Sequence, residues 1–192
     1  MLTFPEKLFN KFPDNPDVII PAEELWERVI AIAKSLVGQK ETPNNSGFVN
    51  KDFEKQMKEV GFSKGQAWCS YAGELIWKTA FGQDHLLYNE LDKLFSASAV
   101  QTYKNFKASK HFKVGTVPKP GALVIWQYGN GWSGHLGVVI DLLTNPSFGT
   151  VEGNTNAAGG REGIEMAQKI RKTGQPFTTK GLNLLGFVYL PE

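Results

Sequence analysis

The chain has 192 residues, of which 41% are hydrophobic and 21% charged, with a formal net charge of +2. These values are ordinary for a soluble globular protein, fit one domain with a full core, and are too weakly basic to indicate a nucleic-acid partner. A single cysteine excludes an internal disulfide bond, and the scattered histidines lack the spacing of a zinc site.

The first 20 residues are predicted to form an extended N-terminal arm. They contain three prolines and several charged residues, so no apolar core of a signal peptide is visible. No apolar stretch approaches the roughly 20 residues that cross a bilayer, so we expect no membrane span. We therefore divide the chain into an arm, residues 1–20, and one domain, residues 21–192. The sequence leaves the localisation unknown.

Helical patterns dominate the first half of the domain. A stripe of apolar residues predicts a helix over about residues 22–37, and Asn50 is a suitable cap for a second helix that ends near Gly61. A third helix begins at Trp68 or Cys69 and ends near Gly82, with the apolar spacing of a buried central helix. Further helices are indicated weakly near residues 86–94 and more clearly over 97–109.

Strand patterns dominate the second half. Alternating or continuous apolar runs, rich in β-branched and aromatic residues, predict five strands. They cover residues 122–128, 135–143, 148–154, 164–171 and 184–190. Helices followed by strands are typical of an α+β domain, in which N-terminal helices pack on a C-terminal antiparallel sheet of about five strands.

Cys69 is the first candidate for chemistry, because it stands where the third helix begins. The positive end of a helix dipole favours thiolate over thiol. Many free cysteines are simply small buried residues, but the helix start favours a nucleophile here. One turn later comes Gly73, and we expect its missing side chain to let a sheet approach the helix closely.

His135 is the candidate base, since it opens a strand directly after a glycine-rich loop, residues 129–134. It is predicted to share a proton with Cys69 and later to protonate the leaving amine. Gly137 lies on the same strand face and is expected to leave room for a substrate or for the nucleophile helix.

Glu152 and Asn154 are the candidate partners of the imidazole. They are two positions apart and so are expected to share a strand face. If the preceding turn has an even number of residues, the pairing register places His135 on that same face. Either side chain could then accept the second imidazole hydrogen bond and fix the tautomer, and the sequence leaves both open.

Three further residues are candidates for substrate binding. The backbone amide of Cys69 is the natural first donor to an oxyanion, and Gln66 is a candidate for the second. Trp68 flanks the nucleophile, and Trp132 lies in the glycine-rich loop, where it is the best candidate for the wall of a groove.

Four blocks of this sequence resemble the CHAP domain family of cysteine, histidine-dependent amidohydrolases and peptidases, relatives of the NlpC/P60 group. The blocks are Trp68-Cys69, PGALVIW at 120–126, GHLGVV at 134–139 and VEGNTN at 151–156. Their order and spacing match, and the resemblance covers about residues 22–190. Ala122 departs from the family, which usually has an acidic residue after the Pro-Gly pair.

The resemblance implies a papain-like fold and cleavage of amide bonds in the peptide part of peptidoglycan. Carried over by position, Cys69 is the nucleophile, His135 the base, and Glu152 with Asn154 the polar partners. The implied enzyme is an N-acetylmuramoyl-L-alanine amidase or an endopeptidase. We expect the chain to be a monomer. Some relatives bind calcium, but no Asp-rich loop supports it here, so we expect neither a metal nor another cofactor. A cysteine hydrolase of a non-wall amide and a non-catalytic wall-binding module are the alternatives.

Overall fold

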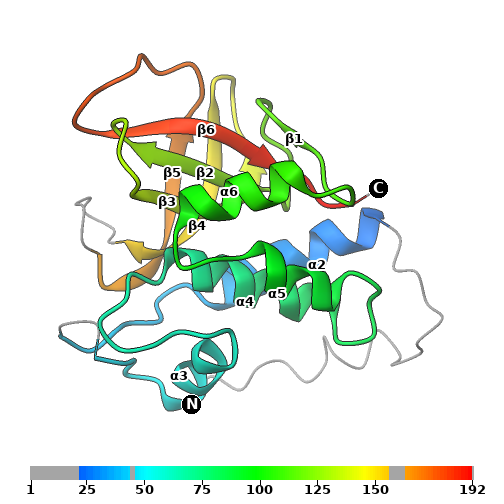
Figure 1. Cartoon of the computed structure of the whole chain (residues 1–192), viewed down its shortest axis with the longest axis vertical. Helices are drawn as coiled ribbons and strands as arrows, with labels where there is room; N and C mark the ends of the chain where they lie inside the picture. The colour runs from blue at the N-terminus through cyan, green and yellow to red at the C-terminus, as the bar shows by residue number, and fades with distance from the viewer. Residues whose placement is uncertain (1–21, 44–45, 156–162, 192) are drawn as a thin grey trace.

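The computed structural model describes residues 22–43, 46–155 and 163–191 (Figure 1). The predicted arm, residues 1–20, lies outside this part of the chain. Helices precede strands, which confirms the α+β order. The helices are α2 (Ala22–Ser35), α3 (Lys51–Glu59), α4 (Cys69–Phe81), α5 (Tyr88–Leu94) and α6 (Ala99–Ala108). The strands are β1 (Val114–Gly115), β2 (Leu123–Tyr128), β3 (Gly134–Leu142), β4 (Ser147–Thr155), β5 (Glu165–Lys172) and β6 (Leu182–Val188).

The strands form one antiparallel sheet in the order β1-β6-β2-β3-β4-β5. It has six strands where the sequence predicted five. The additional strand is β1, whose two residues pair with Phe187 and Val188 of β6. Two residues are too short to show an alternating pattern, so this strand was not visible in the sequence.

Helix ends follow local capping chemistry. The side chain of Asn50 accepts hydrogen bonds from the backbone amides of Asp52 and Phe53, at 3.0 and 3.2 Å, which confirms it as the cap of α3. Ser98 caps α6 in the same way, through the amide of Gln101. None of the helices in the described ranges is both long and apolar enough to cross a bilayer.

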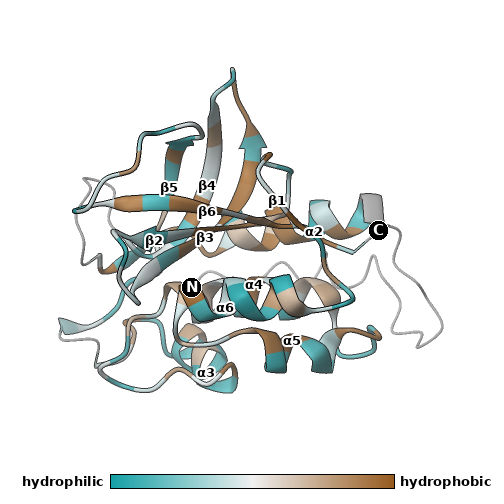
Figure 2. Ribbon diagram, turned by 45° about the horizontal axis from the view of Figure 1, so that its top comes forward, coloured by the Kyte–Doolittle hydropathy of each residue, from teal (hydrophilic) through white to brown (hydrophobic). Residues whose placement is uncertain are grey.

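The main core lies between the helices and one face of the sheet. In Figure 2 the strands occupy the upper half of the molecule, and α3, α4 and α5 lie below them. Helix α4 is central, because 11 of its 13 residues are buried. The strand residues that face the helices are Leu123, Ile125, Leu136, Val138, Ile140, Val151, Met166 and Val188.

The opposite face of the sheet is concave. The rings of Phe148 on β4 and Phe187 on β6 lie 5.4 Å apart, although β2 and β3 run between these two strands. In a flat sheet three strand spacings would separate them by about 14 Å. The sheet therefore curls, and side chains from non-adjacent strands meet inside the curve. The apolar residues buried there are Ala122, Val124, Trp126, Val139, Phe148 and Phe187.

Two glycines set how closely α4 approaches the sheet. A methyl group at Gly73 would lie 2.3 Å from a methyl carbon of Leu136, which confirms that this glycine permits the close approach of β3. A methyl group at Gly153 on β4 would lie 2.6 Å from both the Cβ of Ala72 and the ring of Trp68. Both contacts lie beside Cys69, so they also determine where the sulfur sits against the sheet.

Replacing Gly153 with alanine is expected to lower the free energy of unfolding by about 1–3 kcal/mol, because a ring in a packed core cannot move aside easily. Urea unfolding monitored by circular dichroism measures this loss. Gly149→Ala is the matched control in the same strand, since its nearest new contact is the Cβ of exposed Asp141 at 3.3 Å. Equal stabilities of the two variants would contradict the packing argument.

Candidate active site

Cys69 is the first residue of α4, as the sequence predicted. The preceding residue, Trp68, caps the helix without any side-chain hydrogen bond, so the first amides of the helix need another acceptor. The Cys69 sulfur accepts hydrogen bonds from the backbone amides of Ser70 and of Leu136 on β3. The residue is 5% exposed, so the sulfur lies just under the surface at the seam between helix and sheet.

The side chains of Cys69 and His135 are hydrogen-bonded to each other. Burial alone would raise the pKa of the Cys69 thiol, but the bond to His135, its charge and the two amides outweigh this effect and lower the pKa. A thiol with a lowered pKa beside an imidazole is the arrangement that produces a thiolate–imidazolium pair.

His135 lies near the start of β3, and its side chain is 12% exposed. Its Nε2 donates a hydrogen bond to Oε2 of Glu152 at 2.8 Å, which leaves Nδ1 for Cys69. The ring also stacks on Trp126 of β2, with centroids 5.9 Å apart and planes 28° apart. Burial would lower the pKa of His135, but the bonds to Cys69 and Glu152 raise it to about 10.

Glu152 lies on β4, is fully buried, and uses all the acceptor positions of its carboxylate. Oε1 accepts from the hydroxyl of Thr150 at 2.6 Å and from Nε of Arg171 at 2.7 Å. Oε2 accepts from His135 and from Nη2 of Arg171. Burial would raise the pKa of Glu152, but Arg171 and His135 lower it to about 2, so the group is a carboxylate at neutral pH.

The strand register brings His135 and Glu152 to one face of the sheet, as predicted, but the feature responsible is a β-bulge and not the length of the turn. Near the turn Leu142 pairs with Phe148, a register that would put His135 and Glu152 on opposite faces. A bulge between Val139 and Asp141 shifts the register by one residue, so that further along Gly137 pairs with Glu152. The prediction assumed an even turn, whereas the bulge produces the shared face.

Gly137 leaves room for Glu152. A methyl group at Gly137 would lie 2.7 Å from Cγ of Glu152, its partner across the strands. The expectation that this glycine accommodates a substrate or the nucleophile helix is therefore wrong. The space above it holds the carboxylate that contacts His135.

Asn154 does not contact the imidazole in the described structure. Its backbone is left-handed, with φ at 53°, and the pairing with β5 shifts between Glu152 and Thr155. Asparagine tolerates this conformation better than most residues. Of the two alternatives that the sequence left open, Glu152 is the residue hydrogen-bonded to the ring.

The three residues predicted to bind substrate have different surroundings. Trp68 is 0% exposed, packs edge-on against Phe48, and donates its indole N–H to Glu41. The prediction that this side chain contacts a substrate directly is therefore wrong. The Oε1 of Gln66 accepts from the amide of Ser63 and from the hydroxyl of Tyr71, both at 3.0 Å.

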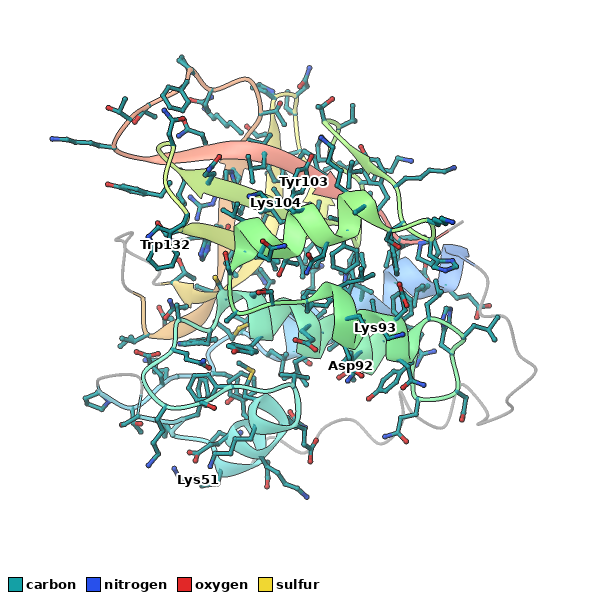
Figure 3. The ribbon with its side chains drawn as sticks, viewed as in Figure 1. Lys51, Asp92, Lys93, Tyr103, Lys104 and Trp132 are labelled. Atoms are coloured by element: carbon teal, nitrogen blue, oxygen red, sulfur yellow. The ribbon has the colours of Figure 1, made fainter. Side chains whose placement is uncertain are left out.

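Trp132, by contrast, is 84% exposed. It projects from the loop between β2 and β3 at the edge of the molecule in Figure 3, three residues before His135. This side chain remains a candidate for substrate contact.

Three contacts of the site were not anticipated from the sequence: those of Thr150, Trp126 and Arg171. The ring of Trp126 stacks on His135 and also contacts the guanidinium of Arg171, which sits 5.1 Å from its centroid. Within the described residues no cluster of three or more His, Cys, Asp or Glu side chains is arranged to hold a metal ion.

The model of the CHAP domain matches residues 59–154, half of the chain. The chain belongs to the CHAP domain family. CHAP domains are generally hydrolytic amidases or peptidases, and the matched segment contains Cys69, His135 and Glu152. Arg171 lies 17 residues beyond the end of the CHAP match. No curated protein sequence matches the chain.

Proposed function

We propose that the protein is a peptidoglycan hydrolase that cleaves amide bonds through a cysteine thiolate. The observation that carries this proposal is the continuous hydrogen-bonded series Cys69–His135–Glu152 at the N-terminus of α4. Membership of the CHAP family and the predominance of amidases and peptidases within it support the reaction class. The helix-on-sheet arrangement, with the cysteine opening the central helix, fits a papain-like fold.

The first half of the proposed reaction acylates Cys69. The thiolate attacks the carbonyl carbon of the substrate amide, and the carbonyl oxygen becomes an oxyanion. The backbone amide of Cys69 is the first proposed donor to this oxyanion. Gln66 is the proposed second donor, because its bonded Oε1 leaves the NH₂ end of the side chain for this role. His135 then gives its proton to the leaving amine, and the C–N bond breaks.

The second half hydrolyses the acyl-enzyme. Once His135 has lost its proton it is a neutral base, and it removes a proton from water as the water oxygen attacks the thioester carbon. Collapse of this intermediate releases the carboxylic acid and returns the sulfur to the thiolate state. Glu152 holds the ring orientation in both halves. Asn154 is proposed to be a polar residue beside the site. Exposed Trp132 is proposed to contact the substrate.

Digestion of purified sacculi followed by mass analysis of the released fragments tests this function. An amidase produces glycan strands without peptides, together with stem peptides that carry a new N-terminal alanine. An endopeptidase produces a new amino terminus inside a stem or a cross-bridge. Cys69→Ala protein is the matched control, since the substitution removes only the sulfur. If wild-type protein releases no new amines from any wall type, peptidoglycan is not the substrate.

A further inference from the structure

Arg171 of β5 is tied to the site by two independent contacts. Its guanidinium donates to both oxygens of Glu152, which is the two-pronged geometry that arginine forms with carboxylates. The same group lies over the ring of Trp126, 5.1 Å from its centroid. Because Trp126 stacks on His135, Arg171 supports the imidazole through Glu152 and through Trp126.

The charges around Glu152 alternate in sign. His135 from β3 and Arg171 from β5 contact Glu152, and Cys69 from α4 contacts His135, so thiolate, imidazolium, carboxylate and guanidinium follow one another. Other titratable side chains placed on this face by strand alternation are Glu165 and Lys169 of β5 and Tyr128 of β2, whereas β1 and β6 carry no charged residue. Without Arg171, the imidazolium alone would offset both the thiolate and the buried carboxylate, which leaves one negative charge in excess.

We propose that Arg171 is a positioning residue that fixes the Glu152 carboxylate and balances its charge, and thereby sets the pH range in which Cys69 is a thiolate. An uncompensated negative charge disfavours a second negative charge nearby, so loss of Arg171 makes the thiolate form at higher pH. The two-pronged contact also keeps Glu152 ionised, so that the imidazolium proton passes to the leaving amine and not to the carboxylate. This role rests on the proposed cysteine chemistry but not on the identity of the substrate.

The pH dependence of Cys69 alkylation by iodoacetamide tests the role without any wall substrate. The variants are Arg171→Met, which removes charge and donors, Arg171→Gln, which keeps a donor, and Arg171→Lys, which keeps the charge. We expect the midpoint of the rise in alkylation rate to move up by about 0.5–1 pH unit in the Met and Gln variants. At a fixed pH below the midpoint, this shift corresponds to a rate about 3–10-fold lower. Arg171→Lys should stay near the wild-type midpoint.

Lys172→Met is the matched control, because Lys172 is the exposed neighbour of Arg171 on the same strand. Its midpoint should equal that of the wild type. If Arg171→Met does not fold, as shown by circular dichroism, the Gln and Lys variants still separate charge from packing. Lower rates with an unchanged midpoint would show a purely structural role and overturn the proposal.

The outcome for Arg171 is separable from the outcome for the function. A wild-type protein whose cysteine reacts at low pH but which releases nothing from sacculi contradicts the wall substrate and leaves the role of Arg171 standing. Full hydrolytic activity combined with unshifted midpoints in the Met and Gln variants overturns the role of Arg171 alone.

Discussion

Replacing Cys69 with serine should reduce the kcat/KM of amide cleavage by at least about 10³-fold, because a serine hydroxyl is not ionised at neutral pH. It would need a neutral imidazole to remove its proton. In the wild type His135 is an imidazolium, because its hydrogen bonds to Cys69 and Glu152 raise its pKa to about 10 against the effect of burial. In the serine variant the contribution of Cys69 is lost, and only Glu152 still favours the protonated ring. The site favours a nucleophile that is already ionised over a hydroxyl that a neutral base would have to deprotonate.

Initial rates of fragment release from sacculi measure this loss, with thermal unfolding as a check of the fold. Serine is close in size to cysteine, so the stability of the variant should remain near that of the wild type. Cys69→Ala is the reference for complete loss of the nucleophile. A serine variant within about tenfold of wild-type activity would show that the reaction does not depend on the sulfur.

The second large effect concerns Glu152, whose replacement by glutamine should lower the free energy of unfolding by about 3 kcal/mol near neutral pH. Glutamine matches the shape but not the charge, so Arg171 keeps its charge in a largely buried place without a counter-ion. The new amide nitrogen also faces a donor, because all acceptor positions of the carboxylate were in use.

The same variant should alter how stability depends on pH. Burial alone would raise the pKa of Glu152, yet Arg171 and His135 lower it from 4.5 to about 2. A carboxyl group with a lowered pKa stabilises the fold above pH 4.5, and this contribution is lost as the pH falls towards 2. Wild-type stability should therefore fall more steeply than that of Glu152→Gln across this window, and the two curves should converge.

Urea unfolding at a series of pH values gives both curves. Glu24→Gln, at an exposed position of α2, is the control, and we expect it to stay within about 0.5 kcal/mol of the wild type. If the curve of Glu152→Gln runs parallel to that of the wild type down to pH 2, the carboxylate does not carry the proposed share of stability.

Much of the arrangement was predictable because its signals are local. Cys69 at a helix start and His135 after a glycine-rich loop each stand in a context that a few neighbouring residues define. The helix boundaries followed in the same way, since a cap such as Asn50 acts on amides two and three positions away. The α+β order required only the change of apolar period along the chain.

What the sequence did not predict depends on contacts between distant segments. Arg171 meets Glu152 because β5 pairs with β4 in one register, and this register is not encoded near Arg171. Trp68 looks like the wall of a groove until Phe48, 20 residues earlier in the chain, packs against its ring. The bulge at β3 likewise changes the register without a visible signal in the residues around it.

The curl of the sheet has a consequence for the newly made protein. The groups around the sulfur come from residues 69, 135, 152 and 171, so the cluster is complete only after most of the chain has left the ribosome. Before that point Cys69 is an ordinary thiol with a pKa of about 8.5 and is largely protonated in the cell. For the proposed cysteine hydrolase, late assembly therefore delays the appearance of a reactive sulfur until the domain has folded.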